Sequence, residues 1–260
     1  ESEAAMSGVL ETQDLTIRFG GHVAVDRVSC AFQPGTLTAI VGPNGAGKTT
    51  YFNLISGQLK ATSGSVRLDG EEIGHLPAPL RTRRGLGRAF QLTQLFPNLT
   101  VLENVRLAVQ SRHGGALQLL RVWLDQKGYI DEAYARLEAV RLGDKAHATA
   151  SSLPHGDQRK LEVALMMALD PKVYMFDEPT AGMSVDEVPV VLELIRSLKE
   201  RRDKTILLVE HKMDVVRELA DRIIVLHNGQ LLADGEPAHV MNLPIVQSAY
   251  MGTADVAEAA

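Results

Sequence analysis

The chain has little of three things, and each scarcity excludes a class of protein. The single cysteine, Cys30, among 260 residues excludes an internal disulfide, and its place in an alternating apolar run predicts a small core residue. No apolar run reaches the ~18 residues of a membrane-spanning helix and no charged-then-apolar leader opens the sequence, so we expect no transmembrane segment. The formal charge of −5 gives no general attraction to nucleic acid, which we do not expect as a partner.

The residues that are present indicate a folded globular protein. Hydrophobic residues make up 45% of the sequence, which is enough for a substantial core. Trp123 stands among leucine and valine, a setting typical of core packing. A short basic cluster, Arg81, Arg83, Arg84 and Arg88, favours a solvated loop over a contact surface.

Apolar periodicity predicts two kinds of sheet. Alternation over residues 9–19, 23–32 and 65–68 indicates strands of a small antiparallel sheet. Continuous apolar runs, which are typical of parallel strands covered by helices on both faces, occupy residues 172–176, 205–209 and 222–226. Helical spacing, which predicts a mostly helical insert, occurs in residues 101–110, 117–125 and 130–140.

The most specific motif lies between an apolar run and a helix-compatible stretch. It consists of Gly42, Pro43, Asn44, Gly45, Ala46, Gly47, Lys48, Thr49 and Thr50. Glycines let backbone amides approach phosphate oxygens closely, and the positive end of the following helix adds to the attraction. Lys48 would reach the β- and γ-phosphates of ATP, and the Thr49 hydroxyl would ligate Mg²⁺. We therefore predict a phosphate-binding loop.

Two carboxylates, Asp177 and Glu178, end the later apolar run at residues 173–176. Ligands bind at the carboxyl ends of strands in open α/β sheets, so this is the expected edge for an active site. Asp177 is suited to hold Mg²⁺, usually through water, and Glu178 is suited to polarise the water that attacks the γ-phosphate. Because the chain turns where a strand ends, both side chains can serve one site.

With these motifs the chain resembles the nucleotide-binding subunit of an ATP-binding cassette (ABC) transporter, from about Leu10 to Gly252. The loop at residues 42–50 matches the Walker A motif of that family, and residues 173–178 match its Walker B motif. The resemblance implies catalytic roles for Lys48 and Glu178, with ATP as substrate and Mg²⁺ as cofactor.

Three further positions take roles from the same resemblance. Gln91, in the run Arg88-Ala89-Phe90-Gln91, matches the Q-loop, which would sense the metal and the attacking water. His211 matches the switch histidine that contacts the γ-phosphate. Phe19 matches the aromatic residue that stacks on adenine, a reasonable partner for a flat base. The implied metal site is thus formed by Thr49, Gln91 and Asp177.

Four segments of the sequence resemble one subfamily of these transporters. Segments that resemble importers of branched-chain amino acids and their urea or amide relatives are Phe19 to Asp26, Gln91 to Val105, Ala181 to Met183 and Asn228 to Gly252. The resemblance implies an importer subunit at the cytoplasmic face of the inner membrane, peripheral to transmembrane permease subunits. A solute-binding protein would be contacted only indirectly.

The motif that the family writes as LSGGQ is altered here. The corresponding residues are Leu153-Pro154-His155-Gly156-Asp157, and Pro154 stands where the family has serine. By the resemblance, residues 154–157 would cap the γ-phosphate of an ATP held by the opposite subunit. Pro154 removes a hydroxyl that would contact this phosphate and cap the helix, while proline is tolerated in a first helical turn. We expect weakened trans contact in an intact fold.

The predicted fold class is α/β, with a RecA-like P-loop NTPase core, a flanking antiparallel β subdomain and a helical subdomain. We assign residues 7–93 and 153–252 to the core with its antiparallel sheet and 94–152 to the helical subdomain. Residues 1–6 and 253–260 are expected to be disordered or left over from cloning. Two copies, or one copy and a homologous ATPase subunit, would close head to tail around two ATP molecules.

Other functions stay open at this point. An ATP-dependent dimerising regulatory module with weak hydrolysis is favoured by Pro154, whereas Glu178, Gln91 and His211 speak against it. A cytosolic ABC-type ATPase of DNA repair or translation would often have tandem cassettes or a long coiled coil, and this chain has one cassette and no long heptad run. An exporter subunit is disfavoured by the subfamily resemblance alone.

Overall fold

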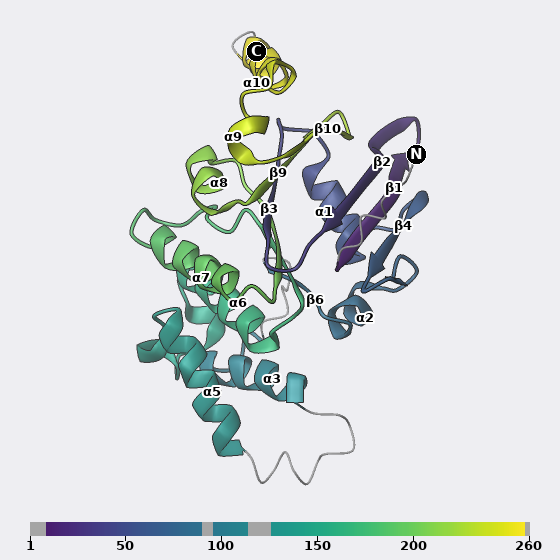
Figure 1. Ribbon diagram of the computed structural model, residues 1–260. Helices are drawn as coiled ribbons and strands as arrows, with labels where there is room; N and C mark the ends of the chain where they lie inside the picture. The colour runs from purple at the N-terminus through teal and green to yellow at the C-terminus, as the bar shows by residue number, and fades with distance from the viewer. Residues whose placement is uncertain (1–8, 90–95, 114–125, 258–260) are drawn as a thin grey trace. The chain divides into compact units, whose positions relative to one another are not determined.

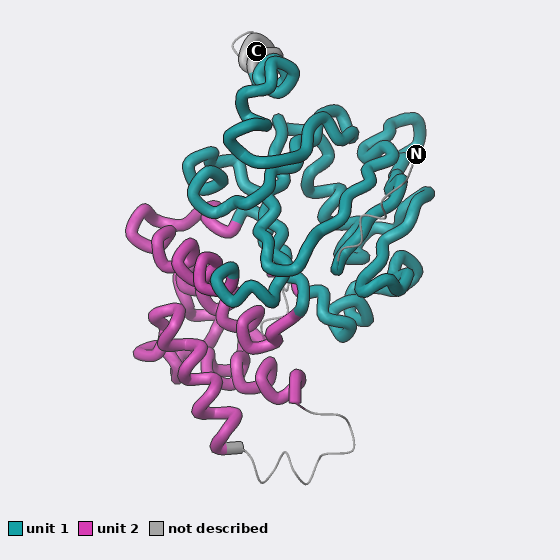
Figure 2. Tube along the Cα trace, viewed as in Figure 1, with its two compact units in different colours: residues 1–86, 172–178, 199–260 teal, residues 87–171, 179–198 magenta. Residues whose placement is uncertain are grey.

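The computed structural model describes residues 9–89, 96–113 and 126–257 (Figure 1). Clustering of its internal contacts divides the chain into two compact units (Figure 2). Unit 1 contains residues 1–86, 172–178 and 199–260, and unit 2 contains residues 87–171 and 179–198. Gln91, Trp123 and the whole of the helix predicted for residues 117–125 lie outside the described residues.

Unit 1 contains a four-stranded antiparallel sheet in the order β2-β1-β4-β5. Its strands are β1 (Leu10–Phe19), β2 (His22–Phe32), β4 (Ser63–Leu68) and β5 (Glu71–Glu72). The turn at Gly20 and Gly21 joins β1 to β2, so Phe19 lies directly opposite His22. The predicted antiparallel strands are thus present.

The second sheet has the order β10-β9-β3-β8-β7-β6. Its strands are β3 (Leu37–Val41), β6 (Leu86–Arg88), β7 (Val173–Asp177), β8 (Thr205–Val209), β9 (Arg222–His227) and β10 (Gln230–Gly235). Strand β3 runs parallel to both β8 and β9, and β7 runs parallel to β8. β10 is an antiparallel edge strand that the sequence prediction missed.

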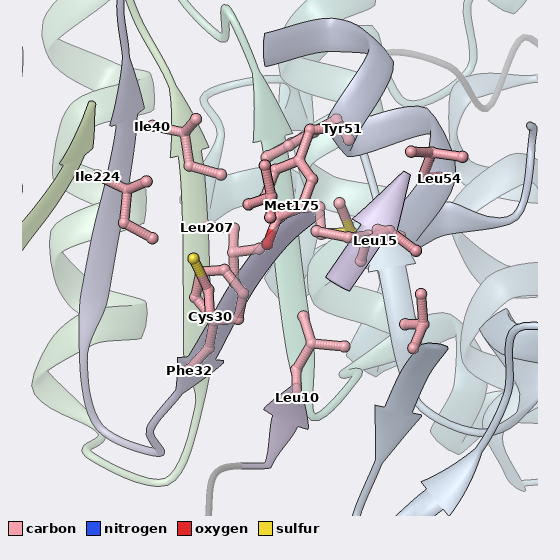
Figure 3. Packing of buried hydrophobic residues seen from close by; sticks show 14 of the residues in the cluster. Leu10, Leu15, Cys30, Phe32, Ile40, Tyr51, Leu54, Met175, Leu207 and Ile224 are labelled. Carbon is pink, nitrogen blue, oxygen red and sulfur yellow. The ribbon is translucent and has the colours of Figure 1, made fainter. Parts of the chain in front are cut away.

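Helix α1 (Lys48–Ser56) supplies core residues that pack with both sheets of unit 1. Tyr51 and Leu54 of α1 belong to the same buried cluster as Leu15 of β1 and Met175 of β7 (Figure 3). Cys30 is a buried member of this cluster, as its apolar surroundings in the sequence predicted. The phosphate-loop helix is therefore fixed by an extensive apolar cluster, whose burial is worth roughly 1.5–3 kcal/mol per large side chain.

The other face of β3 is covered by helices from the end of the chain. Alternation along β3 sends Ile40 to the cluster around α1 and Ala39 and Val41 to a second cluster. That second cluster includes residues of α8 (Met213–Leu219), α9 (Pro237–Val240) and α10 (Pro244–Ala257). Helix α10 reaches Ala257, past the predicted end of the fold at residue 252, and the prediction for residues 253–260 stays a prediction.

The basic cluster before residue 90 is not a solvated loop as a whole. Arg81, in α2 (Ala78–Arg83), is 2% exposed, and its guanidinium donates hydrogen bonds to the carbonyl oxygens of Leu54 (2.7 Å) and Ile55 (2.6 Å) near the end of α1. It also bonds the carbonyls of Gly74 and Leu76. A cation at the carboxyl end of a helix is favourable, so Arg81 caps the helix that begins with Lys48.

Unit 2 is mostly helical. Its described elements are α3 (Val101–His113), α5 (Gln126–Ala139), the 3₁₀ turns η1 (Gly143–Lys145) and η2 (Ala150–Ser152), α6 (His155–Leu169) and the larger part of α7 (Val188–Glu200). α6 packs against α3 and α5, so it clusters with them although the sequence prediction assigned it to the core. The predicted helical range, 94–152, lies within unit 2, and the subdomain boundaries stay a prediction.

Candidate active site

The phosphate loop connects β3 to α1 in a conformation that requires glycine. Gly47, the N-cap of α1, has φ 97°, and a Cβ there would lie 2.5 Å from the carbonyl oxygen of Ala24. Gly42 is equally closed, because its Cβ would lie 2.1 Å from the Leu226 carbonyl oxygen. No side chain caps α1, so its first backbone amides are available to an anion.

Lys48 is the first residue of α1 and is 6% exposed. Its Nζ donates to the carbonyl oxygens of Gly42 (2.7 Å) and Pro43 (2.9 Å). Burial lowers the pKa of Lys48 from its ordinary value, while the charges of Glu178 and Asp177 act in the opposite direction. Because the two bonded acceptors are neutral, the ammonium has no carboxylate hydrogen-bonded to it and can bind a phosphate oxygen.

Asp177 and Glu178 lie at the end of strand β7, beside the end of strand β8. Asp177 is paired with Val209 in the parallel register, and the Glu178 amide donates to the Val209 carbonyl at 2.9 Å. Glu178 has φ 50°, a left-handed conformation that costs a non-glycine residue of order 1–3 kcal/mol and is common at active sites. The chain therefore turns at Glu178, directly after strand β7 ends at Asp177.

His211 follows the end of β8 and contacts Glu178. Its Nε2 donates a hydrogen bond to Glu178 Oε1 at 2.7 Å. Both side chains remain accessible, with 43% of His211 and 40% of Glu178 exposed. The hydrogen bond holds an accessible carboxylate beside an imidazole at the surface of a pocket, an arrangement suited to a general base with an orienting partner.

The pocket has a volume of about 390 Å³. Its lining comprises His22, Ala24, Asn44, Gly45, Ala46, Gly47, Lys48, Thr49, Thr50, Glu178 and His211. Most predicted residues of the loop are thus gathered with the Glu178–His211 pair. Gly42 and Pro43 lie behind the lining, where their carbonyls hold Lys48.

Sequence reasoning missed His22 and Ala24. Both residues follow the Gly20–Gly21 turn and lie in β2. They line the pocket because the fold places β2 next to the phosphate loop, a contact that the sequence does not reveal. Phe19, the predicted adenine partner, is 51% exposed opposite His22 but is not part of the lining. Gln91 lies outside the described residues, so the predictions for Phe19 and Gln91 stay predictions.

In unit 2, helix α6 begins directly after Pro154. Pro154 is the N-cap, and no side chain caps the helix. The Pro154 carbonyl accepts the hydrogen bond of the Gln158 amide at 3.0 Å, so the first turn closes normally. The fold therefore accommodates proline at the position predicted to disturb the motif, and it does so as the N-cap rather than inside the first turn.

Asp157, in the first turn of α6, is bonded to two lysines within unit 2. The Asp157 carboxylate accepts hydrogen bonds from Lys145 and from Lys160, the latter at 2.9 Å. Lys160 also lies 3.3 Å from Glu187, whose carboxylate accepts from the amide and hydroxyl of Ser184. Burial by itself would raise the pKa of Asp157, but the hydrogen bonds and charges of the two lysines together lower it.

Gly156 is packed closely against the same cluster. A Cβ at Gly156 would lie 2.2 Å from Oε2 of Glu187. His155, beside it, approaches Gly182, whose added Cβ would lie 3.3 Å from the imidazole. The residues predicted to meet an opposite ATP are thus held to the segment 182–187 by contacts inside unit 2.

Comparison with known proteins decides the family. A model of the ABC transporter family matches residues 25–181, more than half of the chain. The chain belongs to this family. Two curated relatives are each 38% identical over 95% of this cassette and 98% of their own length: the high-affinity branched-chain amino acid transport ATP-binding proteins BraF of Pseudomonas aeruginosa and LivG of Escherichia coli K12.

Solved structures give the same result for the fold. The ADP conformation of an ATP-binding cassette of an ABC transporter superposes with a TM-score of 0.77 at 28% identity, covering 95% of this chain and 99% of the other. A dimeric post-hydrolysis cassette bound to ADP and phosphate superposes with a TM-score of 0.75 at 27% identity, covering 88% and 98%. The predicted family, α/β fold class and ATPase class are confirmed.

Two further findings concern the described residues. No helix in residues 9–89, 96–113 and 126–257 combines the length and apolar character required to cross a membrane. The same part of the chain contains no group of three or more His, Cys, Asp or Glu side chains arranged to bind a metal by themselves. Magnesium sites that rely on substrate phosphates need only one or two protein ligands, so Thr49 and Asp177 suit that kind of site.

Proposed function

We propose that this cassette is the ATP-hydrolysing subunit of a membrane importer for branched-chain amino acids or a related small polar solute such as urea or amides. The observation that carries the proposal is a single pocket lined by Lys48, Thr49, Glu178 and His211. The similarity of the chain to BraF and LivG supports branched-chain amino acids as the solute class. ATP is the substrate, and water is the second reactant.

The phosphate loop would bind the triphosphate through backbone amides at the start of α1. Lys48, now bonded to the Gly42 and Pro43 carbonyls, can reach a β- or γ-phosphate oxygen by a short movement of its side chain. His22 and Ala24 line the side of the pocket that we assign to the nucleoside, with Phe19 beside them. The chain thus supplies positioning and charge, which dominate catalysis of phosphoryl transfer.

Glu178 would orient the attacking water, and His211 would hold Glu178 in place. Their 2.7 Å hydrogen bond fixes the carboxylate before substrate arrives. Thr49 and Asp177, with Gln91, are the proposed ligands of Mg²⁺, and their oxygen atoms are the donors this hard cation prefers. When bound with ATP, Mg²⁺ neutralises charge that develops on the β- and γ-phosphate oxygens.

The proposed assembly contains two cassettes and membrane-embedded permease subunits at the cytoplasmic face of the inner membrane. In it, residues 154–157 of one cassette face the ATP of the other. The dimeric structure of a solved relative supports the pairing. Whether the second cassette is another copy or a homologous subunit is part of the test below.

The test is Mg²⁺-dependent ATP hydrolysis by the unaltered protein and by Glu178→Gln, with association followed by light scattering. We expect turnover that falls by at least about 100-fold in the variant, together with an ATP-trapped dimer. Glu193→Gln, an exposed pair partner of Arg196, is the matched control and should retain activity. Tight ATP binding without turnover, even beside permease subunits, would instead favour the regulatory module.

A further inference from the structure

The back of the phosphate loop meets a two-residue turn from the far end of the chain. Asn228 (φ 49°) and Gly229 (φ 76°) connect β9 to β10, the geometry of a type I′ hairpin turn. The Gly229 amide donates to the Ala46 carbonyl of the phosphate loop at 3.1 Å. The turn is therefore bonded directly to the loop that the proposed function assigns to phosphate.

The same turn is bonded to strand β2. The Gly229 carbonyl accepts the Asp26 amide at 2.8 Å, and Gln230 Nε2 donates to Asp26 Oδ2 at 2.7 Å. The hydrogen bond from Gln230 is the main cause of the lowered pKa of Asp26. Strand β2 also carries His22 and Ala24, which line the pocket together with the phosphate loop.

The backbones at this point are too close for any side chain. A Cβ on Gly229 would lie 2.7 Å from the Ala24 carbonyl oxygen, and a Cβ on Gly47 would lie 2.5 Å from the same atom. The Gly229 Cα lies 3.4 Å from the position of that Gly47 Cβ. We call the five residues Ala24, Asp26, Ala46, Gly47 and Gly229 the backbone junction.

We propose that the backbone junction sets the spacing between the nucleoside side and the phosphate side of the pocket, with Gly229 as a positioning residue for ATP. This inference rests on the proposed function. The covalent link from β2 to β3 lies at the opposite end of these strands, at residues 33–36, so at the pocket end the junction makes the connection. A ligand that contacts both sides depends on this spacing, whereas inorganic triphosphate contacts one side.

The test compares Gly229→Ala with a matched variant, Gly70→Ala. Gly70 (φ 78°) follows Asp69 (φ 51°) in the turn between β4 and β5. An alanine at Gly70 would therefore have the same backbone strain as an alanine at Gly229. Nothing lies within 4 Å of a Cβ on Gly70, whereas the Cβ on Gly229 would overlap the Ala24 carbonyl. The difference between the two variants therefore reports the junction and not the left-handed conformation.

Dissociation constants are measured for Mg-ATP and for inorganic tripolyphosphate, and KM and kcat for ATP hydrolysis. For Gly229→Ala we expect ATP affinity to fall about tenfold, tripolyphosphate affinity to stay unchanged, and KM to rise with kcat held within about twofold. Gly70→Ala should match the unaltered protein in all four quantities. Gln230→Ala, which removes one hydrogen bond to Asp26 and no backbone contact, should weaken ATP about two- to threefold and serves if Gly229→Ala fails to fold.

Equal losses of ATP and tripolyphosphate affinity in Gly229→Ala would overturn the inference, because the turn would then act on the phosphate loop itself. Unchanged ATP affinity in both Gly229→Ala and Gln230→Ala would overturn it as well. If the unaltered protein bound no ATP, the proposed function would fail and this inference with it. If the ratio of the dissociation constants for ATP and tripolyphosphate were the same in all variants, this inference would fail while the proposed function would stand.

Discussion

In the pocket of unit 1, Lys48 is bonded to two neutral carbonyl groups, whereas at the start of α6 in unit 2 Asp157 is bonded to two lysines. The first arrangement leaves a charge available to a ligand. In the second arrangement the carboxylate and the two lysines neutralise one another. Helix α6 can therefore interact with a phosphate only through its backbone amides and its dipole. The phosphate loop thus presents a cation to its pocket, while the charged side chains at the start of α6 mainly hold that helix in place.

The largest effect should come from removing the available charge. Lys48→Ala should lower kcat/KM for ATP by about 100- to 1000-fold, the usual cost of losing one preorganised group aimed at transition-state charge. Steady-state hydrolysis and nucleotide binding measure it. Lys60→Ala, which removes an exposed lysine of the same unit, should leave both unchanged. Comparable activity in Lys48→Ala and Lys60→Ala would break the distinction between the two regions.

A smaller effect, on stability rather than chemistry, should follow from Asp157→Asn. The variant should lose about 1–3 kcal/mol of unfolding free energy at pH 7, because it leaves charge-assisted hydrogen bonds unmade; the partial exposure of Lys145 limits the loss. Since the folded-state pKa of Asp157 is lowered, its contribution is present above the unfolded value of about 3.9 and is lost as pH falls through the folded pKa.

Urea unfolding at pH 7 and at pH values below about 4 measures that difference. The gap between the two proteins should be constant from about pH 5 to 8 and shrink in acid. Asp203→Asn, in an ion pair whose aspartate is 54% exposed, should change stability by less than about 0.5 kcal/mol. A gap that widened in acid would contradict the assigned role of the two lysines.

The smallest effect concerns the cap of α6. Pro154→Ser should supply a side-chain acceptor for the first turn, worth about 0.5–2 kcal/mol, and should raise turnover a few-fold when assayed with the permease partners. Pro77→Ser makes the same exchange at the N-cap of α2 in unit 1, which also lacks a side-chain cap. It should leave turnover unchanged. Equal turnover and ATP affinity for Pro154→Ser and the unaltered protein would contradict the expectation.

The same contrast explains how much the sequence could reveal. The phosphate loop, Asp177 and Glu178 stand at the ends of apolar runs, so local pattern was enough to propose them, whereas the role proposed for His211 came from the resemblance to the ABC family. Strands β3, β7, β8 and β9 were found for the same reason, because each is a nearly continuous apolar run, whereas β6 and β10 were not predicted. What local pattern cannot give is the partner of a side chain far away in the chain.

Arg81 illustrates this limit. Its neighbours Arg83 and Arg84 suggested a solvated basic loop, yet its guanidinium reaches carbonyls 26 and 27 positions earlier. Asp157 is a second case: its position favoured a contact with nucleotide, and its bonds to Lys145 and Lys160 depend on how η1 packs beside α6. His22 is a third, since only the pairing of strands brings it to the pocket.

The positive φ of Glu178 has a consequence for how this protein can be improved or lost. The residue that we propose to orient water has a backbone conformation that glycine would adopt without the same penalty. Glu178→Gly would remove this backbone strain, and it would also remove the hydrogen bond to His211 and the carboxylate to which we assign the attacking water. At this one position, backbone strain and the proposed role in turnover therefore favour different residues.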